Sequence, residues 1–330
     1  MLHSTQVGYR RYVAQYLSVL LAILLIVSSI NVLVDPLWHF KGNQITGVNL
    51  PLNERTAKVN LFLKNPKKYD CLIFGSSKTT MLPASKISQH TCINLSFSAG
   101  NINEFITYAQ YIESLGFLPK MIYVGVDEYN FFSSLENNVP HFVKSRTLPR
   151  PIYQDIFSLD VFYFSLRTLL NGLNPRPRYY NASFEGTFHK PIKEYHPRKK
   201  LSPRSQSFNP DVAKRYGEFK KSFPTATVVG YVPPLSVWHV TERLYLSGYM
   251  SDYLKAMTQV ASSFDALYDF SVPSQITTVA DETYDGVHYS YSVNEKVVDV
   301  LQGRCQYGNF GINVEPGNVE EYKEGYAHLL

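Results

Sequence analysis

Cysteine is scarce in this chain, and the few cysteines form no metal-binding pattern. Three occur in 330 residues, at positions 71, 92 and 305, and their spacing fits no zinc signature. A glycine-rich nucleotide loop is also absent, because Gly75-Ser76-Ser77-Lys78 lacks the upstream glycine of a phosphate loop. The net charge of +5 is too small to indicate nucleic acid by itself. We therefore expect no metal, no cofactor and no nucleic-acid partner.

Charge is missing from one long stretch near the N-terminus. Residues 12–34 contain no Asp, Glu, Lys or Arg, and about twenty apolar residues suffice to span a bilayer as a helix. Arg10 and Arg11 precede the stretch, so the positive-inside rule makes residues 1–11 cytoplasmic, residues 12–35 a transmembrane helix and the remainder extracytoplasmic. A cleavable signal peptide would have a shorter apolar core and a small-residue cleavage site. We predict a retained single-pass anchor in the cell membrane.

Two short blocks carry the residues of a nucleophilic site. Residues 72–74 form an apolar run typical of a buried parallel strand, and Gly75-Ser76-Ser77 then breaks the run. A serine at the carboxyl end of a strand lies where open α/β sheets place their chemistry. Far downstream, Asp285 and His288 are three residues apart, so one loop could deliver a base and its orienting carboxylate. The plainer alternative is a serine helix cap and a surface histidine.

Apolar runs with helical segments between them predict an α/β fold. A parallel sheet of five strands in the order 2-1-3-4-5, with helical crossovers, corresponds to a flavodoxin-like three-layer sandwich. We place a stalk and entry helix at residues 36–67, the α/β domain at 68–302, and a tail without a clear motif at 303–330. A single helix is expected over residues 240–263. The five runs are residues 71–74, 92–97, 121–126, 226–232 and 266–270.

The serine and histidine blocks together resemble the SGNH (GDSL-type) hydrolase superfamily, which has Gly-Asp-Ser after its first strand and Asp-x-x-His near its end. The resemblance implies that Ser77 is the nucleophile, His288 the general base and Asp285 the residue that holds the tautomer of the imidazole. It also implies an oxyanion hole formed by the backbone N–H groups of Ser77 and Gly100, the latter following the second strand.

Two positions depart from the pattern of this superfamily. Ser76 stands where an Asp is usual, and Gly125-Val126-Asp127-Glu128 stands where the superfamily has Gly-x-Asn-Asp. The missing Asn would donate a hydrogen bond to the oxyanion, whereas a carboxylate at that place would repel it. We therefore interpret Asp127 as a structural or substrate-orienting residue, with Asn130 as a remote substitute for the Asn.

The chain is similar to a narrower group, the extracytoplasmic SGNH-like proteins of cell-envelope modification, among them teichoic-acid D-alanylation and alginate O-acetylation proteins. The similarity covers residues 68–302 outside an insertion, and includes Asn94-Leu95-Ser96-Phe97-Ser98-Ala99-Gly100 and Pro233-Pro234. It implies a membrane-bound O-acyltransferase as partner, an envelope or secreted polysaccharide as substrate, and O-acyl transfer or ester hydrolysis as the reaction. The alternatives are a non-catalytic module that binds polymer or scaffolds the acyltransferase, and a membrane-anchored lipase or esterase.

A long insertion, about residues 131–223, separates the third and fourth strands. It is rich in Pro, Tyr and basic residues, which indicates either a surface for an acidic polymer or anionic headgroups, or a solvated loop. Its apolar stretch at residues 159–170 is expected to be a short helix that packs on the domain or touches the membrane. Cys71 and Cys92 are the first residues of two neighbouring predicted strands. They could form a disulfide in the outside compartment, or they could be buried free thiols.

Overall fold

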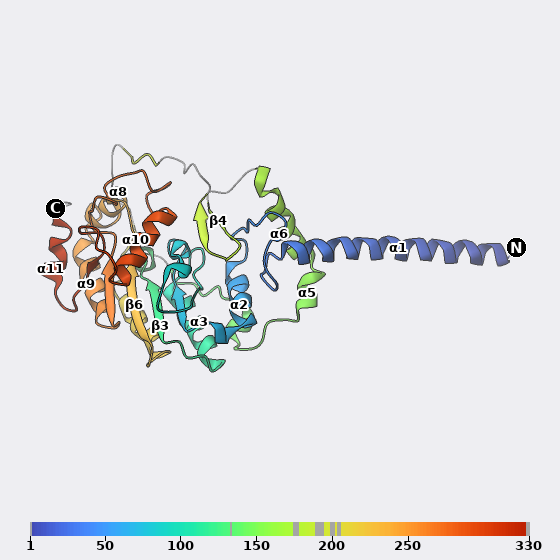
Figure 1. Cartoon of the computed structure of the whole chain (residues 1–330), viewed down its shortest axis with the longest axis horizontal. Helices are drawn as coiled ribbons and strands as arrows, with labels where there is room; N and C mark the ends of the chain where they lie inside the picture. The colour runs from blue at the N-terminus through green and yellow to red at the C-terminus, as the bar shows by residue number, and fades with distance from the viewer. Residues whose placement is uncertain are drawn as a thin grey trace.

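One long helix projects from a globular part in this computed structural model (Figure 1). The structure describes residues 2–132, 134–173, 178–188, 195–198, 202 and 206–327. Helix α1 (Leu2–Val34) projects, and its segment Tyr9–Val34 is long and apolar enough to cross a membrane. This length and composition agree with the predicted single span.

A mostly parallel six-stranded sheet forms the centre of the globular part. Its order is β2-β1-β3-β6-β7-β8, and only the last pair, β7 with β8, is antiparallel. The predicted sheet of five strands in the order 2-1-3-4-5 is therefore not matched, because β8 is added at one edge. The sequence did not predict β8, since this strand has only two residues and forms no apolar run. The strands are β1 (Cys71–Phe74), β2 (Cys92–Asn94), β3 (Met121–Gly125), β6 (Thr227–Val232), β7 (Ala266–Asp269) and β8 (Ile312–Asn313).

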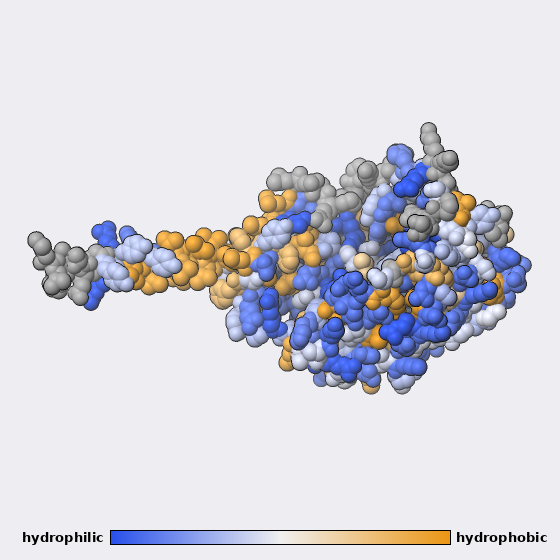
Figure 2. Space-filling view, turned by 180° about the vertical axis from the view of Figure 1, so that it is seen from behind, coloured by the Kyte–Doolittle hydropathy of each residue, from blue (hydrophilic) through white to orange (hydrophobic). Residues whose placement is uncertain are grey.

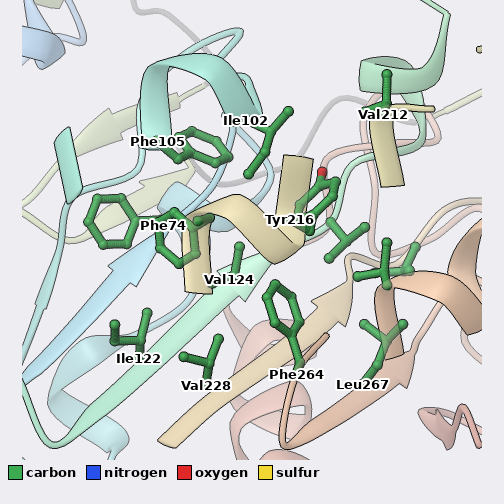
Figure 3. Close-up of a cluster of buried hydrophobic side chains, with 14 of the residues drawn as sticks. Phe74, Ile102, Phe105, Ile122, Val124, Val212, Tyr216, Val228, Phe264 and Leu267 are labelled. Atoms are coloured by element: carbon green, nitrogen blue, oxygen red, sulfur yellow. The ribbon is translucent and has the colours of Figure 1, made fainter. Parts of the chain in front are cut away.

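Helices cover both faces of the sheet, because successive strand residues point to opposite sides. Phe74 and Val124 pack under α3 (Ile102–Ser114), α7 (Val212–Lys221) and α9 (Met250–Ala261), as Figure 3 shows for part of this cluster. Ile73 and Tyr123 point to the other side, where α10 (Tyr291–Leu301) covers them. The result is an α/β architecture with a helical layer on each face.

The single helix expected over residues 240–263 is wrong. The structure has α8 (Val237–Val240), one π-helical turn at Thr241–Tyr245, and then α9, which begins at Met250. Gly248 separates the last two with a φ of +77°, a conformation that a glycine adopts without steric cost. Apolar spacing alone did not reveal this break.

The segment predicted as a stalk is built into the globular part. Its helix α2 (Glu54–Lys64) is capped by the Asn53 side chain, which accepts a hydrogen bond from the N–H of Thr56. Ala57, Val59 and Phe62 of this helix are buried. Trp38 stacks on Phe184 at 4.4 Å between ring centroids, so residues ahead of α2 also contact the insertion.

The insertion and the tail contribute further elements. Residues 174–177 and 199–201, part of the predicted basic surface, lie outside the described residues. The tail, residues 303–330, supplies β8 and α11 (Val319–Glu324), and α11 packs on α9. The insertion holds α4 (His141–Lys144), α5 (Ile152–Ile156), α6 (Leu159–Leu169), the hairpin of β4 (Arg178–Tyr180) and β5 (Gly186–Phe188), and α7. Short 3-10 turns lie at Pro66–Lys68, Thr79–Met81, Ala84–Lys86, Glu128–Phe131 and Leu170–Leu173.

Candidate active site

Ser77 lies in a tight turn at the carboxyl end of β1, beside the end of β3. Gly75 and Gly125 approach each other there, and a Cβ atom added to either would collide with the side chain of Thr79. The amide of Asn94 at the end of β2 holds the turn, because it donates to the carbonyls of Thr79 (2.9 Å) and Leu82 (3.1 Å). The neighbouring strand ends therefore fix the turn that presents Ser77.

Ser77, His288 and Asp285 form one continuous chain of hydrogen bonds. The Oγ of Ser77 lies 2.8 Å from Nε2 of His288, and Nδ1 of His288 lies 2.7 Å from Oδ2 of Asp285. Ser77 and His288 are 211 positions apart in sequence, and the loop before α10 returns His288 to the end of β1. The side chain of His288 is 17% exposed, so the imidazole is shielded while Ser77 stays half-buried and accessible.

The loop itself orients the carboxylate of Asp285. Its Oδ1 accepts hydrogen bonds from the N–H groups of Val287 (3.0 Å) and His288 (2.8 Å). Burial alone would raise the pKa of Asp285, but the hydrogen bonds from the His288 ring and from these two N–H groups hold the pKa below its ordinary value. Asp285 therefore stays a carboxylate that accepts a hydrogen bond from the N–H at Nδ1 of His288. Nε2 then carries no proton and can accept one from Ser77.

Aromatic stacking fixes the plane of the His288 ring. The ring of Tyr284 lies parallel to it, with 5.5 Å between centroids and 1° between planes. Phe188 of strand β5 packs edge-on against Tyr284 at 5.0 Å. The β4–β5 hairpin of the insertion therefore supports the histidine from outside the sheet.

A buried arginine from the same hairpin holds the serine turn. Arg178 donates through Nη1 to the carbonyl of Ser77 (3.4 Å) and to the hydroxyl of Thr80, and through Nη2 to Oγ of Ser98 (2.5 Å). Its charge faces Glu54 of α2 at 3.5 Å. Glu54 also accepts from the N–H of Ser98 at 2.7 Å, so α2, the hairpin and the turn after β2 meet behind Ser77.

Asp127 is paired with a buried lysine. Nζ of Lys78 lies 3.1 Å from Oδ1 of Asp127 and 2.5 Å from Oε2 of Glu128, and Nε2 of His239 lies 3.1 Å from the other oxygen of Glu128. Burial raises the pKa of Asp127, whereas the Lys78 charge, acting against burial, holds the pKa of Glu128 well below its usual range. The carboxylate that replaces the expected Asn therefore has a neutralising partner directly after Ser77.

Of the groups predicted to donate to the oxyanion, only the N–H of Gly100 has another partner in this conformation. The N–H of Gly100 donates to the carbonyl of Phe97 at 3.0 Å, and the amide oxygen of Asn130 accepts from the N–H of Ile102 at 2.9 Å. The Nδ2 group of Asn130, which is the donor that the prediction needs, is buried and makes no hydrogen bond to a described residue. No hydrogen bond joins the N–H of Ser77 to another described residue, so this predicted donor remains available.

A polar pocket of about 200 Å³ adjoins Asp285. Trp238 and Tyr195 meet edge to face there, with 6.1 Å between ring centroids. The pocket is lined by Tyr195, His196, Arg198, Trp238, His239, Glu242 and Asp285. A larger cavity of about 380 Å³ beside Cys92 and Glu185 includes no residue of the hydrogen-bonded chain, whereas the smaller pocket includes one, Asp285.

The three cysteines lie outside the hydrogen-bonded chain. Cys71 and Cys92 form a disulfide between β1 and β2, which decides between the two alternatives left by the sequence, and Cys305 is an exposed free thiol. In the described part of the chain, no cluster of three or more His, Cys, Asp or Glu side chains could hold a metal.

Comparison of the chain with family models, curated proteins and solved structures finds no match.

Sequence reasoning located the three members of the hydrogen-bonded chain but missed the residues that support them. Tyr284 adjoins the Asp285 block and could have been noticed as an aromatic neighbour of the histidine. Arg178 and Glu54 left no local signal, because they come from an insertion and from a predicted stalk. His239 was a lone histidine in a helical segment.

Proposed function

We propose that this chain is a membrane-anchored, SGNH-like protein that transfers or hydrolyses O-acyl groups of an envelope or secreted polysaccharide. The observation that carries the proposal is the hydrogen-bonded chain from Ser77 through His288 to Asp285 at the carboxyl edge of a parallel sheet. A flavodoxin-like sandwich belongs to the same proposal, with β8 as an added antiparallel edge strand. The same arrangement of nucleophile, base and orienting carboxylate serves acyl transfer on unrelated folds.

In the proposed reaction, each proton has a path. The Oγ of Ser77 attacks the carbonyl carbon of an O-acyl ester while its proton passes to Nε2 of His288. Collapse of the tetrahedral intermediate breaks the ester bond, and the departing alcohol takes the proton from His288. An acceptor hydroxyl or water then attacks the Ser77 ester in the same way and releases the serine. Asp285 stabilises the imidazolium in both halves.

The pocket beside Asp285 supports a sugar as the acceptor. Trp238 and Tyr195 offer aromatic faces, and Glu242 and His239 offer polar groups, beside the member of the chain farthest from Ser77. Such pockets combine apolar walls with a few polar groups that fix orientation. A sugar held there would anchor the polymer, whereas the acceptor hydroxyl itself has to reach Nε2 of His288 beside Ser77.

A second candidate is a polymer-binding or scaffolding module without catalysis. The engaged N–H of Gly100 and the carboxylate of Asp127 favour it, because neither would stabilise an oxyanion as they stand. In both versions, a membrane-bound O-acyltransferase is the proposed partner.

The decisive experiment compares polymer acylation in cells that carry wild type, Ser77→Ala or His288→Ala, with protein amounts measured by blotting. Loss of acylation in both variants supports transfer, and an excess supports hydrolysis. Unchanged acylation in both would remove the catalytic proposal and leave the binding module. In parallel, a fluorophosphonate should label Ser77, and the labelling should fall by orders of magnitude without His288.

The proposal also includes topology, with residues 1–11 in the cytoplasm and the globular part outside. Arg10 and Arg11 ahead of the apolar span support this orientation. Protease added to intact spheroplasts should digest the globular part, whereas its protection would reverse the assignment.

A further inference from the structure

Helix α6 exposes an apolar stripe that is unusual for a helix on a water-soluble domain. Two of the three buried residues of this helix, Ser165 and Thr168, are polar, and the third is Val161. Leu159, Tyr163, Leu166 and Leu170 face outward with 71%, 55%, 36% and 56% exposure. Their spacing of four, three and four residues places them on one side of the helix. An outward apolar stripe of this kind is unfavourable in water and favourable against hydrocarbon.

Helix α6 is fastened to the last turns of α1 by a buried asparagine. Asn31, within the apolar span, is 4% exposed. Its amide donates to the carbonyls of Ile156 (2.9 Å) and Ser158 (3.0 Å), where α5 ends and α6 begins, and its oxygen accepts from the hydroxyl of Ser165 (3.1 Å). Val27 and Val34 of α1 are also buried, and α1 contacts both α5 and α6. In Figure 1, α6 and α5 lie on either side of the end of α1.

The length of α1 puts this contact at the edge of a bilayer. The 26 residues of Tyr9–Val34 extend over about 39 Å at 1.5 Å per residue, whereas the hydrocarbon core is about 30 Å thick. With Arg10 and Arg11 at the inner headgroups, the outer boundary of the hydrocarbon falls near Asn31. Helix α6 crosses α1 at this level. In Figure 2 the apolar surface of α1 continues onto the adjoining globular part.

We propose that α5 and α6 form an interfacial element whose outward stripe inserts among the acyl chains of the outer leaflet. Exposed apolar residues also precede α6: Ile152 and Tyr153 lie in α5, and Phe157 directly follows α5. Arg167 lies over the ring of Tyr163 (5.7 Å from guanidinium carbon to centroid), so its stem can cover apolar surface while its charge reaches the headgroups. The proposal rests on α1 spanning the bilayer and is independent of the chemistry at Ser77.

The test uses the full chain in phosphatidylcholine vesicles, with Cys305→Ser as background. Leu159→Cys and Leu170→Cys place an environment-sensitive fluorophore at the two ends of the stripe. Leu118→Cys is the matched control, because Leu118 is an equally exposed leucine (69%) in the loop between α3 and β3. Leu21→Cys reports on the span itself. We expect blue-shifted emission and quenching by spin-labelled lipid at 21, 159 and 170, and neither at 118.

Each other outcome overturns the proposal. Emission at 159 and 170 like that at 118, with 21 quenched, would show a spanning α1 and a solvated α6. Blue-shifted emission at 159 and 170 without lipid quenching would show that a second copy of the chain covers the stripe. An unquenched label at 21 would remove the span on which the proposal rests. Thermal unfolding of each labelled protein checks that it is folded.

Discussion

Asp127 is the residue at which this site departs most from the pattern it resembles. Its carboxylate follows β3, where the resemblance expects an amide that donates to the oxyanion, and Lys78 lies 3.1 Å away. Whether this charge limits turnover depends on its distance from the developing oxyanion. A substitution that restores the amide tests this directly.

We expect Asp127→Asn to increase the hydrolysis of a simple ester such as nitrophenyl acetate by about tenfold or more, because one oxyanion donor is worth roughly 10²–10³ in turnover. Asp127→Ala removes the charge without adding a donor and should gain less. Initial rates of the purified variants check both. Equal rates in wild type and Asp127→Asn would mean that residue 127 does not face the oxyanion.

Lys58 is a second residue with a measurable consequence, because it is wholly buried behind the site. Its ammonium lies over the rings of Tyr180 (4.9 Å) and Phe184 (5.2 Å), and burial lowers its pKa from 10.5 to about 7. Between these two pH values the unfolded chain binds the proton more tightly than the folded chain. The free energy of unfolding should therefore rise with pH across that window.

We expect Lys58→Met to remove this rise and to increase the free energy of unfolding below pH 7 by up to about 5 kcal/mol, at 1.36 kcal/mol per pKa unit. Denaturant titrations from pH 6 to 10 check the slope. Lys120→Met, at a side chain that is 76% exposed, is the control and should leave the profile unchanged. If the unfolding free energy of Lys58→Met rose with pH as steeply as that of the wild type, the lowered pKa would not belong to Lys58.

At the scale of elements, the disulfide joins the strand that ends at the Ser77 turn to the neighbouring strand that ends at Asn94. Cys71 opens β1 and Cys92 opens β2, 21 residues later. A cross-link that closes a loop of this length stabilises the fold by roughly 3 kcal/mol, chiefly by restricting the unfolded chain. It also requires an oxidising compartment, in agreement with the proposed position outside the cytoplasm.

We expect the double variant Cys71→Ala/Cys92→Ala to lose roughly 3 kcal/mol of unfolding free energy under oxidising conditions. Reduction of the wild type should lower its stability by a similar amount. Cys305→Ser, which alters the exposed free thiol, should unfold like the wild type. If denaturant titration finds the double variant as stable as the wild type, the bond contributes nothing.

The elements that sequence could predict are those whose signal is local. Strands β1, β3 and β6 are buried almost throughout and therefore appear as continuous apolar runs, whereas β8 has two residues and shows no pattern. Ser77, Asp285 and His288 were predictable because each lies in a short, distinctive block. Arg178 was not, since only folding brings its hairpin to the carbonyl of Ser77. The partner of Asp127 was likewise hidden, because Lys78 comes from another strand end.

At the scale of the whole molecule, residues 36–67 belong to the globular part rather than to a free linker. Phe62 and Val59 of α2 lie in the main core, and Glu54 contacts the turn after β2. Replacing one buried Phe by Ala typically costs about 3–5 kcal/mol, against a total stability of about 5–15 kcal/mol. Loss of the whole helix should therefore unfold the domain.

We expect a chain that begins at residue 35 to fold in mild detergent, and a chain that begins at residue 66 to fail. The first keeps α2 and its contacts, whereas the second removes the buried face of α2 and the Glu54 carboxylate. Cooperative thermal unfolding, followed by circular dichroism, distinguishes the two. A cooperative transition in the shorter chain would show that α2 is dispensable.

The contacts of residues 36–53 also determine how the site can meet its substrate. Asn49 exchanges backbone hydrogen bonds with Tyr180 of the hairpin that contacts Ser77, and Trp38 stacks on Phe184 of the same hairpin. With α1 in a bilayer, no tether lets the domain swing or change its reach. Ser77 would then work at one constant height above the lipid surface. Under the function proposed above, a polymer would meet Ser77 only at that height.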